Sequence, residues 1–378
     1  MAQHEDSFPI LGIDYIQFYV GNAKQAAHFY RSYGFRPIAF RGLETGTRDT
    51  VSWAVRQGDV TLVFTGALDG DHPVAEHVKL HGDGVHDVAL RVPDAEEAYR
   101  VAIGRGARGV AEPEVFEDEH GKLIRAAIST YGETIHSLVS RPDYSGIFWP
   151  GFVALDEKGH TTPNESERVA DPDVSGFGVL YVDHVVGNVE LGRMNDWVSF
   201  YEQVMGFVEL RHFSDEDIST EYSALMSKVV WDGEGKIKFP INEPAEGKKK
   251  SQIEEYLEYY KTPGVQHIAL TTEDIVKTVD VMTSEGIEFL RIPRTYYDEA
   301  VQRVPQIKDQ VEDLARNGIL VDKDEDGYLL QIFTKPVQDR PTVFYEVIER
   351  HGAKGFGDGN FKALFEAIER EQDARGNL

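Results

Sequence analysis

The sequence predicts an α+β protein made of two tandem halves, each containing two strand–helix–strand modules. Two observations lead to this fold class. First, two kinds of strand–helix segment occur once in each half, roughly 170–180 residues apart, which is the pattern of an internal duplication. Second, short β-rich runs such as Val60–Phe64 and Leu329–Phe333 lie between and after these segments.

The first repeated segment is a strand that leads through a Val-Gly-Asn sequence into an amphipathic helix. It begins at Ile13-Asp14-Tyr15 in one half and at Val182-Asp183-His184 in the other. Both helices carry apolar residues at i, i+3, i+4 and i+7, which predicts one buried stripe on each. Gly34 and Gly206 are expected to end them in the left-handed conformation. The stripe residues are Ala26, Phe29, Tyr30 and Tyr33 in the first helix, and Trp197, Phe200, Tyr201 and Val204 in the second.

The second repeated segment pairs Gly84–Leu90 with Gly264–Leu270, each a short strand followed by a helix. These two helices are expected to close at Gly106 and Gly286. We therefore expect a first domain over residues 11–150, a polar, proline-containing linker over 151–178, and a second domain over 179–378.

The end of the chain lies outside the repeat. The segment from Phe361 to Arg375 has a helical apolar pattern, and the glycine-rich run Gly352–Gly359 before it is predicted to be a hinge. A terminal helix on such a hinge is free to act as a lid over a site in the second half.

The composition excludes several classes of site. The chain has 378 residues, a formal charge of −26 and no cysteine. Thiolate metal sites and iron–sulfur clusters are therefore excluded, and an acidic surface disfavours nucleic acid and anionic membranes as partners. No apolar run is long enough for a transmembrane helix, and residues 1–6 lack the features of a signal peptide. We expect a cytoplasmic protein.

Three predicted strands of the second half each carry one metal-type ligand, namely His184, His267 and Glu346. An imidazole or a carboxylate among apolar strand residues is costly to bury without a partner. The first-half counterparts of the two histidines are Tyr15 and Asp87, so the ligand pattern occurs once although the fold occurs twice. Two imidazoles and one carboxylate suit Fe(II), Mn(II), Ni(II) or Zn(II), and the residues alone do not choose among these metals.

Strand alternation adds an expectation about the neighbours of these ligands. It places Val182, His184 and Val186 on one face of their strand. By the same rule, the side chain of Gln266 is expected to point away from that of His267.

The second half resembles the 4-hydroxyphenylpyruvate dioxygenase family of the vicinal-oxygen-chelate superfamily, and the likeness extends over the chain from about Leu11 onward. The resemblance rests on five motifs that are specific in combination. They are Asp183–Asn188, Phe239–Pro244, Gly264–Leu270, Leu329–Pro336 and Gly355–Phe361.

The resemblance implies two open-barrel domains and an Fe(II) ion held by His184, His267 and Glu346. It also implies that 4-hydroxyphenylpyruvate binds the iron through its 2-oxo acid group and reacts with O2 to give homogentisate and CO2, a step of tyrosine and phenylalanine catabolism. Polar pocket positions of the family match Ser227, Asn242, Gln252, Gln331 and, less firmly, Gln266. Aromatic pocket and lid positions match Phe333, Phe356 and Phe361.

Three alternatives stay open beside this interpretation. Hydroxymandelate synthase resembles the same family and oxidises the benzylic carbon of the same substrate, and retention of Phe333 and Phe361 favours the dioxygenase over it. A metal-free protein that binds aromatic compounds is a second alternative, against which the intact ligand set argues. An extradiol ring-cleaving dioxygenase is a third, and the Gln331 and Phe356–Phe361 motifs do not belong to that class. The family implies a homodimer, with a tetramer as the other assembly.

Overall fold

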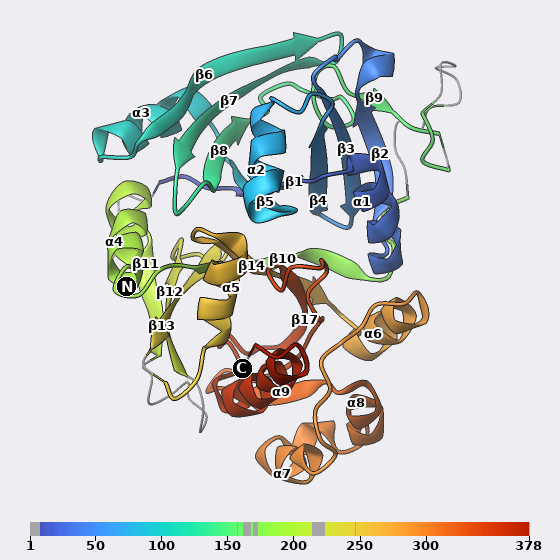
Figure 1. The fold of residues 1–378 in the computed structure, drawn as a ribbon, viewed down its shortest axis with the longest axis vertical. Coiled ribbons are helices and arrows are strands. Elements are labelled where there is room, and N and C mark those ends of the chain that lie inside the picture. Colours follow the sequence, from blue (N-terminus) through green and yellow to red (C-terminus); the bar gives the residue numbers. More distant parts are fainter. Residues whose placement is uncertain are drawn as a thin grey trace.

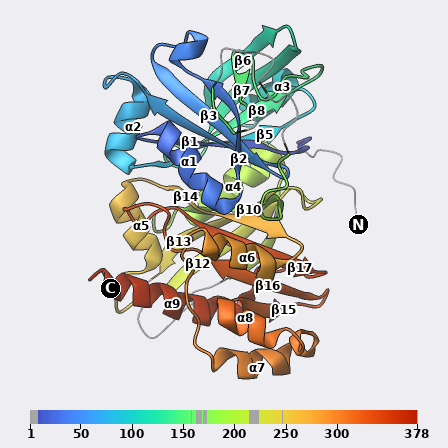
Figure 2. The ribbon, with the colours of Figure 1, turned by 90° about the vertical axis from the view of Figure 1, so that its right-hand side faces the viewer.

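Each half of the chain forms one curled β-sheet, and the two sheets are stacked along the long axis of the molecule (Figures 1 and 2). The computed structural model describes residues 8–156, 158–161, 168, 173–213, 224–245 and 247–377, without the side chains of residues 358, 361 and 362. Within these residues the first sheet has nine strands in the order β6-β7-β8-β5-β1-β4-β3-β2-β9. The second has eight, in the order β11-β12-β13-β10-β14-β17-β16-β15.

The first half contains the elements that precede residue 155. The last of them, β9, lies within the predicted linker and pairs with β2. The elements are β1 (Gly12–Tyr19), α1 (Ala23–Phe29), η1 (Tyr30–Tyr33), β2 (Arg36–Arg41), η2 (Leu43–Thr45), β3 (Thr50–Gln57), β4 (Val60–Ala67), α2 (Pro73–His81), β5 (Gly84–Arg91), α3 (Ala95–Gly104), β6 (Gly109–Asp118), β7 (Gly121–Ser129), β8 (Ile135–Ser140) and β9 (Val153–Ala154).

The second half repeats this order with three further short helices before its last hairpin and a C-terminal helix. The elements are β10 (Val179–Asn188), α4 (Met194–Met205), β11 (Val208–Phe213), β12 (Ala224–Trp231), β13 (Lys238–Ala245), α5 (Gln252–Tyr260), β14 (Gly264–Thr272), α6 (Ile275–Ser284), α7 (Tyr296–Arg303), η4 (Pro305–Ile307), α8 (Val311–Asn317), β15 (Leu320–Lys323), β16 (Tyr328–Phe333), β17 (Phe344–His351), η5 (Asp358–Asn360) and α9 (Phe361–Ala374).

The two sheets have the same central pairing, which confirms the predicted duplication and the α+β class. In the first sheet β1 runs antiparallel to β5, and β5 runs parallel to β8. In the second sheet β10 runs antiparallel to β14, and β14 runs parallel to β17. Both predicted helices of the first repeat end at glycines in the left-handed conformation, Gly34 and Gly206.

Both central strand pairs contain β-bulges at equivalent places. The register shifts leave Asp14 as the extra residue on β1 and Asp183 as the extra residue on β10. The partner strands have extra residues too, His86 on β5 and Gln266 on β14. A bulge interrupts the alternation of side chains between the two faces, so residues next to it can point to the same side.

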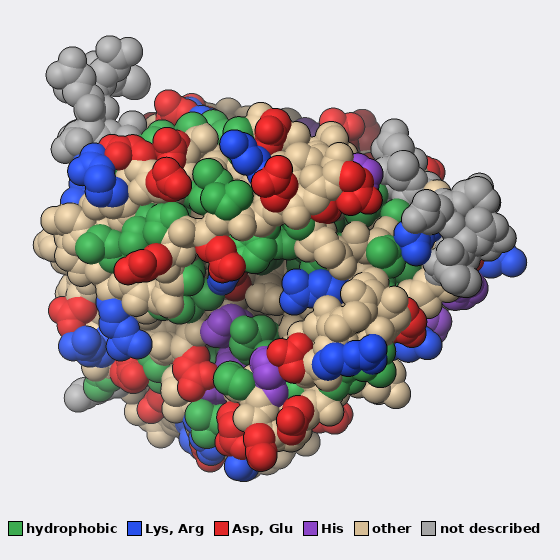
Figure 3. All heavy atoms as spheres, turned by 90° about the horizontal axis from the view of Figure 1, so that it is seen from above, with side chains coloured by type: hydrophobic (Ala, Val, Ile, Leu, Met, Phe, Trp, Pro, Cys, Tyr) green, Lys and Arg blue, Asp and Glu red, His purple; other side chains and the backbone are tan. Residues whose placement is uncertain are grey.

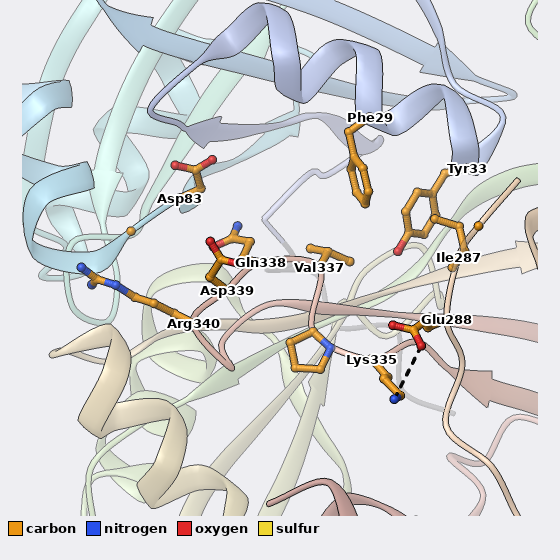
Figure 4. Close-up of a pocket in the computed structure, with 13 residues that line it drawn as sticks. Phe29, Tyr33, Asp83, Ile287, Glu288, Lys335, Val337, Gln338, Asp339 and Arg340 are labelled. Atoms are coloured by element: carbon orange, nitrogen blue, oxygen red, sulfur yellow. Dashed lines mark ion pairs between the residues drawn. The ribbon is translucent and has the colours of Figure 1, made fainter. Parts of the chain in front are cut away.

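One stripe residue of the first helix was predicted wrongly. Tyr30 and Tyr33 are buried as expected, but the side chain of Phe29 is 44% exposed. The α-helix stops at Phe29 and continues as a 3₁₀-helix, and the buried stripe runs through Ala23, Ala27, Tyr30 and Tyr33, which leaves Phe29 beside it. Phe29 instead lines a cavity of about 610 Å³ between the two halves (Figure 4).

The two halves share one continuous hydrophobic core, and polar groups join them as well. The hydroxyl groups of Tyr30 and Tyr345 lie 3.0 Å apart, and the carbonyl oxygen of Tyr260 accepts a hydrogen bond from Nδ1 of His81. In the described part of the chain no helix is long and apolar enough to cross a membrane.

We expect Gly58→Ala to destabilise the junction between the halves. Gly58 has a φ of +53°, and an added Cβ would lie 2.5 Å from the backbone oxygens of Val179 and Leu180, so the backbone must move. Gly192→Ala is the matched control, because its φ is +79° but no atom lies within 4 Å of an added Cβ. Urea unfolding is expected to show a loss of about 1 kcal/mol for Gly192→Ala and about 3 kcal/mol or more for Gly58→Ala. Equal losses would contradict the close packing at Gly58.

Candidate metal centre

The three predicted ligands meet on neighbouring strands of the second sheet. His184 lies on β10, His267 on β14 and Glu346 on β17, and all three side chains are buried. Oε2 of Glu346 is 3.1 Å from Nε2 of His184 and 3.5 Å from Nε2 of His267. One ligand atom from each residue lies within 4.8 Å of the other two, so a single ion can contact all three.

The bulges give each histidine a partner for its second ring nitrogen. Nδ1 of His184 lies 2.8 Å from Oδ1 of Asp183, and Nδ1 of His267 lies 3.0 Å from Oε1 of Gln266. The expectation that Gln266 points away from His267 was wrong, because Gln266 is the extra residue of a bulge and lines the same cavity. Partners of this kind fix the ring orientation of a metal-binding histidine and leave Nε2 free for a metal.

Asp183 is a buried carboxylate with two cationic partners. Its oxygens pair with Nε and NH2 of Arg350 at 2.7 and 2.8 Å, and the ammonium of Lys238 is 3.4 Å away. Burial alone would raise the pKa of Asp183, but hydrogen bonds from His184 and Arg350 outweigh it and hold the pKa well below its ordinary value. Asp183 is therefore charged at neutral pH and can orient His184.

The protonation states of the three ligands follow from the same balance. Burial opposes the charge of Glu346, but the neighbouring His184 and hydrogen bonds from both imidazoles lower its pKa below the ordinary value. Burial lowers the pKa of His267 and keeps its imidazole neutral, whereas the charge of Glu346 overcomes burial at His184 and raises its pKa. A proton on His184 and a metal ion therefore compete for the same Nε2.

A cavity of about 80 Å³ adjoins the cluster and is closed on one side by α9. Leu364, Phe365 and Ile368 of α9 line it, as expected for a terminal helix that covers the site. The structure brings most of the predicted pocket residues to this cavity. They are Ser227, Asn242, Gln252, Gln331, Phe333 and Phe356, together with Gln266. Phe361 begins α9, but its side chain lies outside the described part of the chain.

Aromatic rings surround the two imidazoles. The ring of Phe356 packs edge-on against His184 with centroids 5.1 Å apart, and that of Phe333 packs edge-on against His267 at 5.9 Å. Phe344 stacks on His267 at 4.8 Å, and the sequence analysis missed this residue. The signal that could have found it is its position two residues before Glu346, which places both side chains on the same face of β17.

The cavity also contains an unsatisfied polar atom. Oε1 of Gln331 is buried without a hydrogen-bond partner in the structure. A buried acceptor without a donor is costly, so this atom is suited to accept a hydrogen bond from a ligand in the cavity.

The equivalent place in the first half is filled by side chains that bond to one another. The hydroxyl group of Tyr15 donates to Oδ2 of Asp87 at 3.1 Å, and both the backbone N–H and the hydroxyl group of Ser137 donate to the same carboxylate. Tyr15 and Asp87 occupy the positions of His184 and His267, and Ser137 occupies that of Glu346 by strand register. This half therefore has a closed hydrogen-bond network where the second half has the candidate ligands.

The fold and the His–His–Glu cluster define a protein of the glyoxalase/bleomycin resistance protein/dioxygenase superfamily, whose family model matches residues 181–332. A second model, described as the N-terminal part of hydroxyphenylpyruvate dioxygenase, matches residues 4–148. The chain belongs to the 4-hydroxyphenylpyruvate dioxygenase family, since curated members align with it almost from end to end.

The relatives come from distant eukaryotes. The 4-hydroxyphenylpyruvate dioxygenases of Tetrahymena thermophila, Xenopus tropicalis and Yarrowia lipolytica are 48%, 47% and 46% identical, and each alignment covers 97% of this chain and 92–93% of the relative. A solved structure of a triple-substituted 4-hydroxymandelate synthase from Streptomyces coelicolor superposes with a TM-score of 0.83 at 34% identity, covering 96% of this chain and 99% of that one.

We expect the variants His184→Ala, His267→Ala and Glu346→Ala to lose bound Fe(II). Each change removes one of three converging donor atoms. The affinity for Fe(II) should therefore fall by more than about 100-fold, which exceeds the usual loss when a residue that contacts only a metal ligand is changed. Iron content after anaerobic loading and desalting measures this. His212→Ala is the control, because His212 is exposed on β11 of the same half. A variant that keeps full iron content would remove its residue from the ligand set.

We expect Asp183→Asn to weaken metal binding although no candidate ligand changes. The amide keeps the shape of the carboxylate but loses the charge that orients His184, so Fe(II) affinity should fall about 10- to 100-fold. The change also leaves Arg350 buried without its counter-ion, and the free energy of unfolding should fall by about 3–5 kcal/mol. Asp196→Asn, which alters an exposed ion pair with Arg193, should change neither quantity. Unchanged iron affinity in Asp183→Asn would show that the Asp183–His184 contact does not support the site.

Proposed function

We propose that this protein is an Fe(II)-dependent 4-hydroxyphenylpyruvate dioxygenase. It converts 4-hydroxyphenylpyruvate and O2 into homogentisate and CO2 by oxidative decarboxylation, ring hydroxylation and migration of the side chain. The substrate's own 2-oxo acid group replaces a separate 2-oxo acid cosubstrate. The observation that carries the proposal is a buried His–His–Glu cluster beside an aromatic cavity in a chain whose full length matches curated members of this family.

The donor set supports Fe(II) as the metal, with His184, His267 and Glu346 as its ligands. Two imidazoles and one carboxylate on one side of an ion match the facial arrangement of non-haem iron oxygenases and leave positions open for other ligands. When bound, Fe(II) supplies the one-electron chemistry that activates dioxygen. Asp183 and Gln266 fix the tautomers and the orientation of the two imidazoles.

The cavity walls suit a phenol with a short acidic side chain. Phe333 and Phe356 can pack against the substrate ring, and Phe361 belongs to the same aromatic set by its position in the family motif. Polar groups on separate strands and one helix can orient the hydroxyl and carboxylate groups of the substrate. These groups belong to Ser227, Asn242, Gln252 and Gln331. The unpartnered Oε1 of Gln331 is the acceptor that a phenolic hydroxyl group would satisfy.

The helix α9 keeps water away from the reacting groups. Its apolar residues Leu364, Phe365 and Ile368 close the cavity, and exclusion of water protects reactive species from side reactions. Glycines Gly352 and Gly357, both in the left-handed region, precede α9 and permit a change in the path of the chain there. Product release is then expected to require movement of α9.

Other features stay predictions. We propose that residues 11–150 and 179–378 are the two domains and that 151–178 is the linker. The family resemblance predicts a homodimer, with a tetramer as the alternative, and the sequence predicts a cytoplasmic location.

A 4-hydroxymandelate synthase is the alternative function, because a protein with that name has the same fold at 34% identity. It would use the same metal and substrate but would oxidise the benzylic carbon. The names of the curated relatives favour the dioxygenase, as does the retention of Phe333, which lines the cavity, and of Phe361.

The decisive test is product identification after anaerobic loading with Fe(II), followed by addition of 4-hydroxyphenylpyruvate and oxygen. We expect oxygen uptake with formation of equal amounts of CO2 and homogentisate, identified by mass spectrometry. 4-Hydroxymandelate as the product would show the synthase instead. Absence of oxygen uptake with iron demonstrably bound would show that the substrate assignment is wrong and would leave only the metal site. Ring-opened products would indicate an extradiol enzyme.

The Phe361→Ile variant tests the aromatic part of the proposal. The smaller side chain should change the ratio of products or the coupling of oxygen uptake to product formation, while iron content stays the same. Leu191→Ile, a substitution at an exposed aliphatic position, is the control and should change neither the product ratio nor the coupling. An unchanged product ratio and unchanged coupling would reduce Phe361 to a packing role.

A further inference from the structure

A second cluster of metal-type ligands lies in the first half, away from the site described above. His77 and His81 stand one turn apart on α2, and Glu133 faces them from the turn between β7 and β8. Oε2 of Glu133 is 3.0 Å from Nδ1 of His77 and 3.1 Å from Nε2 of His81. Figure 3 shows one face of the molecule, with exposed histidine side chains beside a hollow; His77 and His81 are themselves buried.

The cluster has the same donor types and the same compactness as the His184–His267–Glu346 cluster. In both, two imidazole nitrogens and one carboxylate oxygen lie within 4.8 Å of one another. Two histidines at i and i+4 on a helix place their rings on one face, which is a frequent arrangement for binding a metal ion.

One ring nitrogen of each histidine is buried without a hydrogen-bond partner. These atoms are Nε2 of His81, which lies near the carboxylate of Glu133 without hydrogen-bond geometry, and Nε2 of His77. Nδ1 of His77 does form a hydrogen bond with Oε2 of Glu133 at 3.0 Å. The same carboxylate oxygen is thus approached by two imidazole nitrogens, and the buried, unpartnered Nε2 of His81 is suited to bind an ion that all three residues share.

The second nitrogen of His81 is held as metal-binding histidines usually are. Nδ1 of His81 bonds to the carbonyl oxygen of Tyr260 at the end of α5. A carbonyl oxygen can accept a hydrogen bond but cannot donate one. Nδ1 of His81 therefore carries the hydrogen, and Nε2 has its lone pair free.

The turn that carries Glu133 is fixed from both sides. The backbone N–H of Thr130 donates to the carbonyl oxygen of Thr134 across it, and the Cβ of an alanine at Gly132 would lie 2.1 Å from the carbonyl oxygen of Pro263 in the second half. The carboxylate therefore stays near the histidines, while 47% of its side chain remains exposed and leaves access for water and ions.

We propose that His77, His81 and Glu133 form a second metal site, which binds a divalent transition-metal ion such as Zn(II) at the junction of the two halves. Two imidazoles and one carboxylate with a position open to water are a ligand set that Zn(II) accepts. The ion would connect α2 to the turn between β7 and β8, next to α5 of the other half. Its role is structural, because the ligands join α2 to the turn between β7 and β8, and His81 bonds to Tyr260 of the other half.

The test counts metal ions in the full chain. Protein loaded anaerobically with Fe(II) is incubated with ZnCl2 and desalted, and iron and zinc are measured together by mass spectrometry. We expect about two equivalents of total metal in the wild type and about one in Glu133→Gln, with at least a tenfold loss of affinity for zinc at the second site. Total metal is the readout, so exchange of iron for zinc at the first site does not change the count.

Matched variants separate metal binding from general damage. Glu76→Gln removes the same charge from an exposed side chain of α2 that pairs with Lys79, and it should keep about two equivalents. His77→Ala should behave like Glu133→Gln, whose nearly isosteric change at a half-exposed position is the safer one for folding. Added Zn(II) should raise the melting temperature of the wild type and Glu76→Gln, but less that of Glu133→Gln.

Two results would overturn the proposal. One is a wild type that binds a single equivalent of total metal. The other is a Glu133→Gln variant that binds as much metal as Glu76→Gln does. In either case the cluster is a hydrogen-bonded contact between α2 and the turn, and it holds no ion.

Discussion

The buried ion pair between Asp183 and Arg350 connects the parts of the molecule on which the site depends. Asp183 is the bulged residue of β10 and orients His184, while Arg350 lies on β17 four residues after Glu346. Arg350 also donates to the carbonyl oxygens of Ala353 and Gly355, at the start of the segment that leads to α9. Buried charges are tolerated only when their partners are in place. This one network therefore holds β10 and β17 in position, orients the imidazole of His184 and anchors the segment that leads to α9.

The first half contains the same ion pair without the same ligands. Asp14, the bulged residue of β1, pairs at 2.7 Å with Arg141, the residue after the end of β8, as Asp183 pairs with Arg350. The duplicated chain has thus kept the bulge and the charge pair in both copies. In the first copy Tyr15, Asp87 and Ser137 satisfy one another at the positions that carry the candidate ligands in the second. The same backbone arrangement can therefore support different side-chain chemistry. Equivalent bulges lie beside a closed polar network in one half and beside a candidate metal centre in the other.

The sequence predicted those features that depend on local pattern and on the repeat. Strand and helix positions, the glycine helix ends at Gly34 and Gly206, and the convergence of His184, His267 and Glu346 all follow from periodicity and from the position of each segment within its module. The orientation of Gln266 could not be predicted in this way. A β-bulge depends on how two strands pair, and the sequence of a single strand does not show it. The exposure of Phe29 was missed since a change from α- to 3₁₀-winding comes from tertiary packing. The cluster of His77, His81 and Glu133 joins a helix to a turn some fifty residues later, and only the fold brings them together.

The helix α5 relates the two clusters in space. It begins at Gln252, which lines the cavity beside the candidate iron ligands, and ends at Tyr260, whose carbonyl oxygen accepts the hydrogen bond from His81. A capping box at Ser251 and Glu254 fixes its start, and the ring of Tyr260 stacks on that of His81 at its end. This nine-residue helix contains neither proline nor glycine, the usual causes of a kink, so its two ends are rigidly connected. The position of Gln252 in the cavity therefore depends in part on the packing of α2 against α5. The first half, which lacks the candidate ligands of the main site, still contributes to the shape of the pocket.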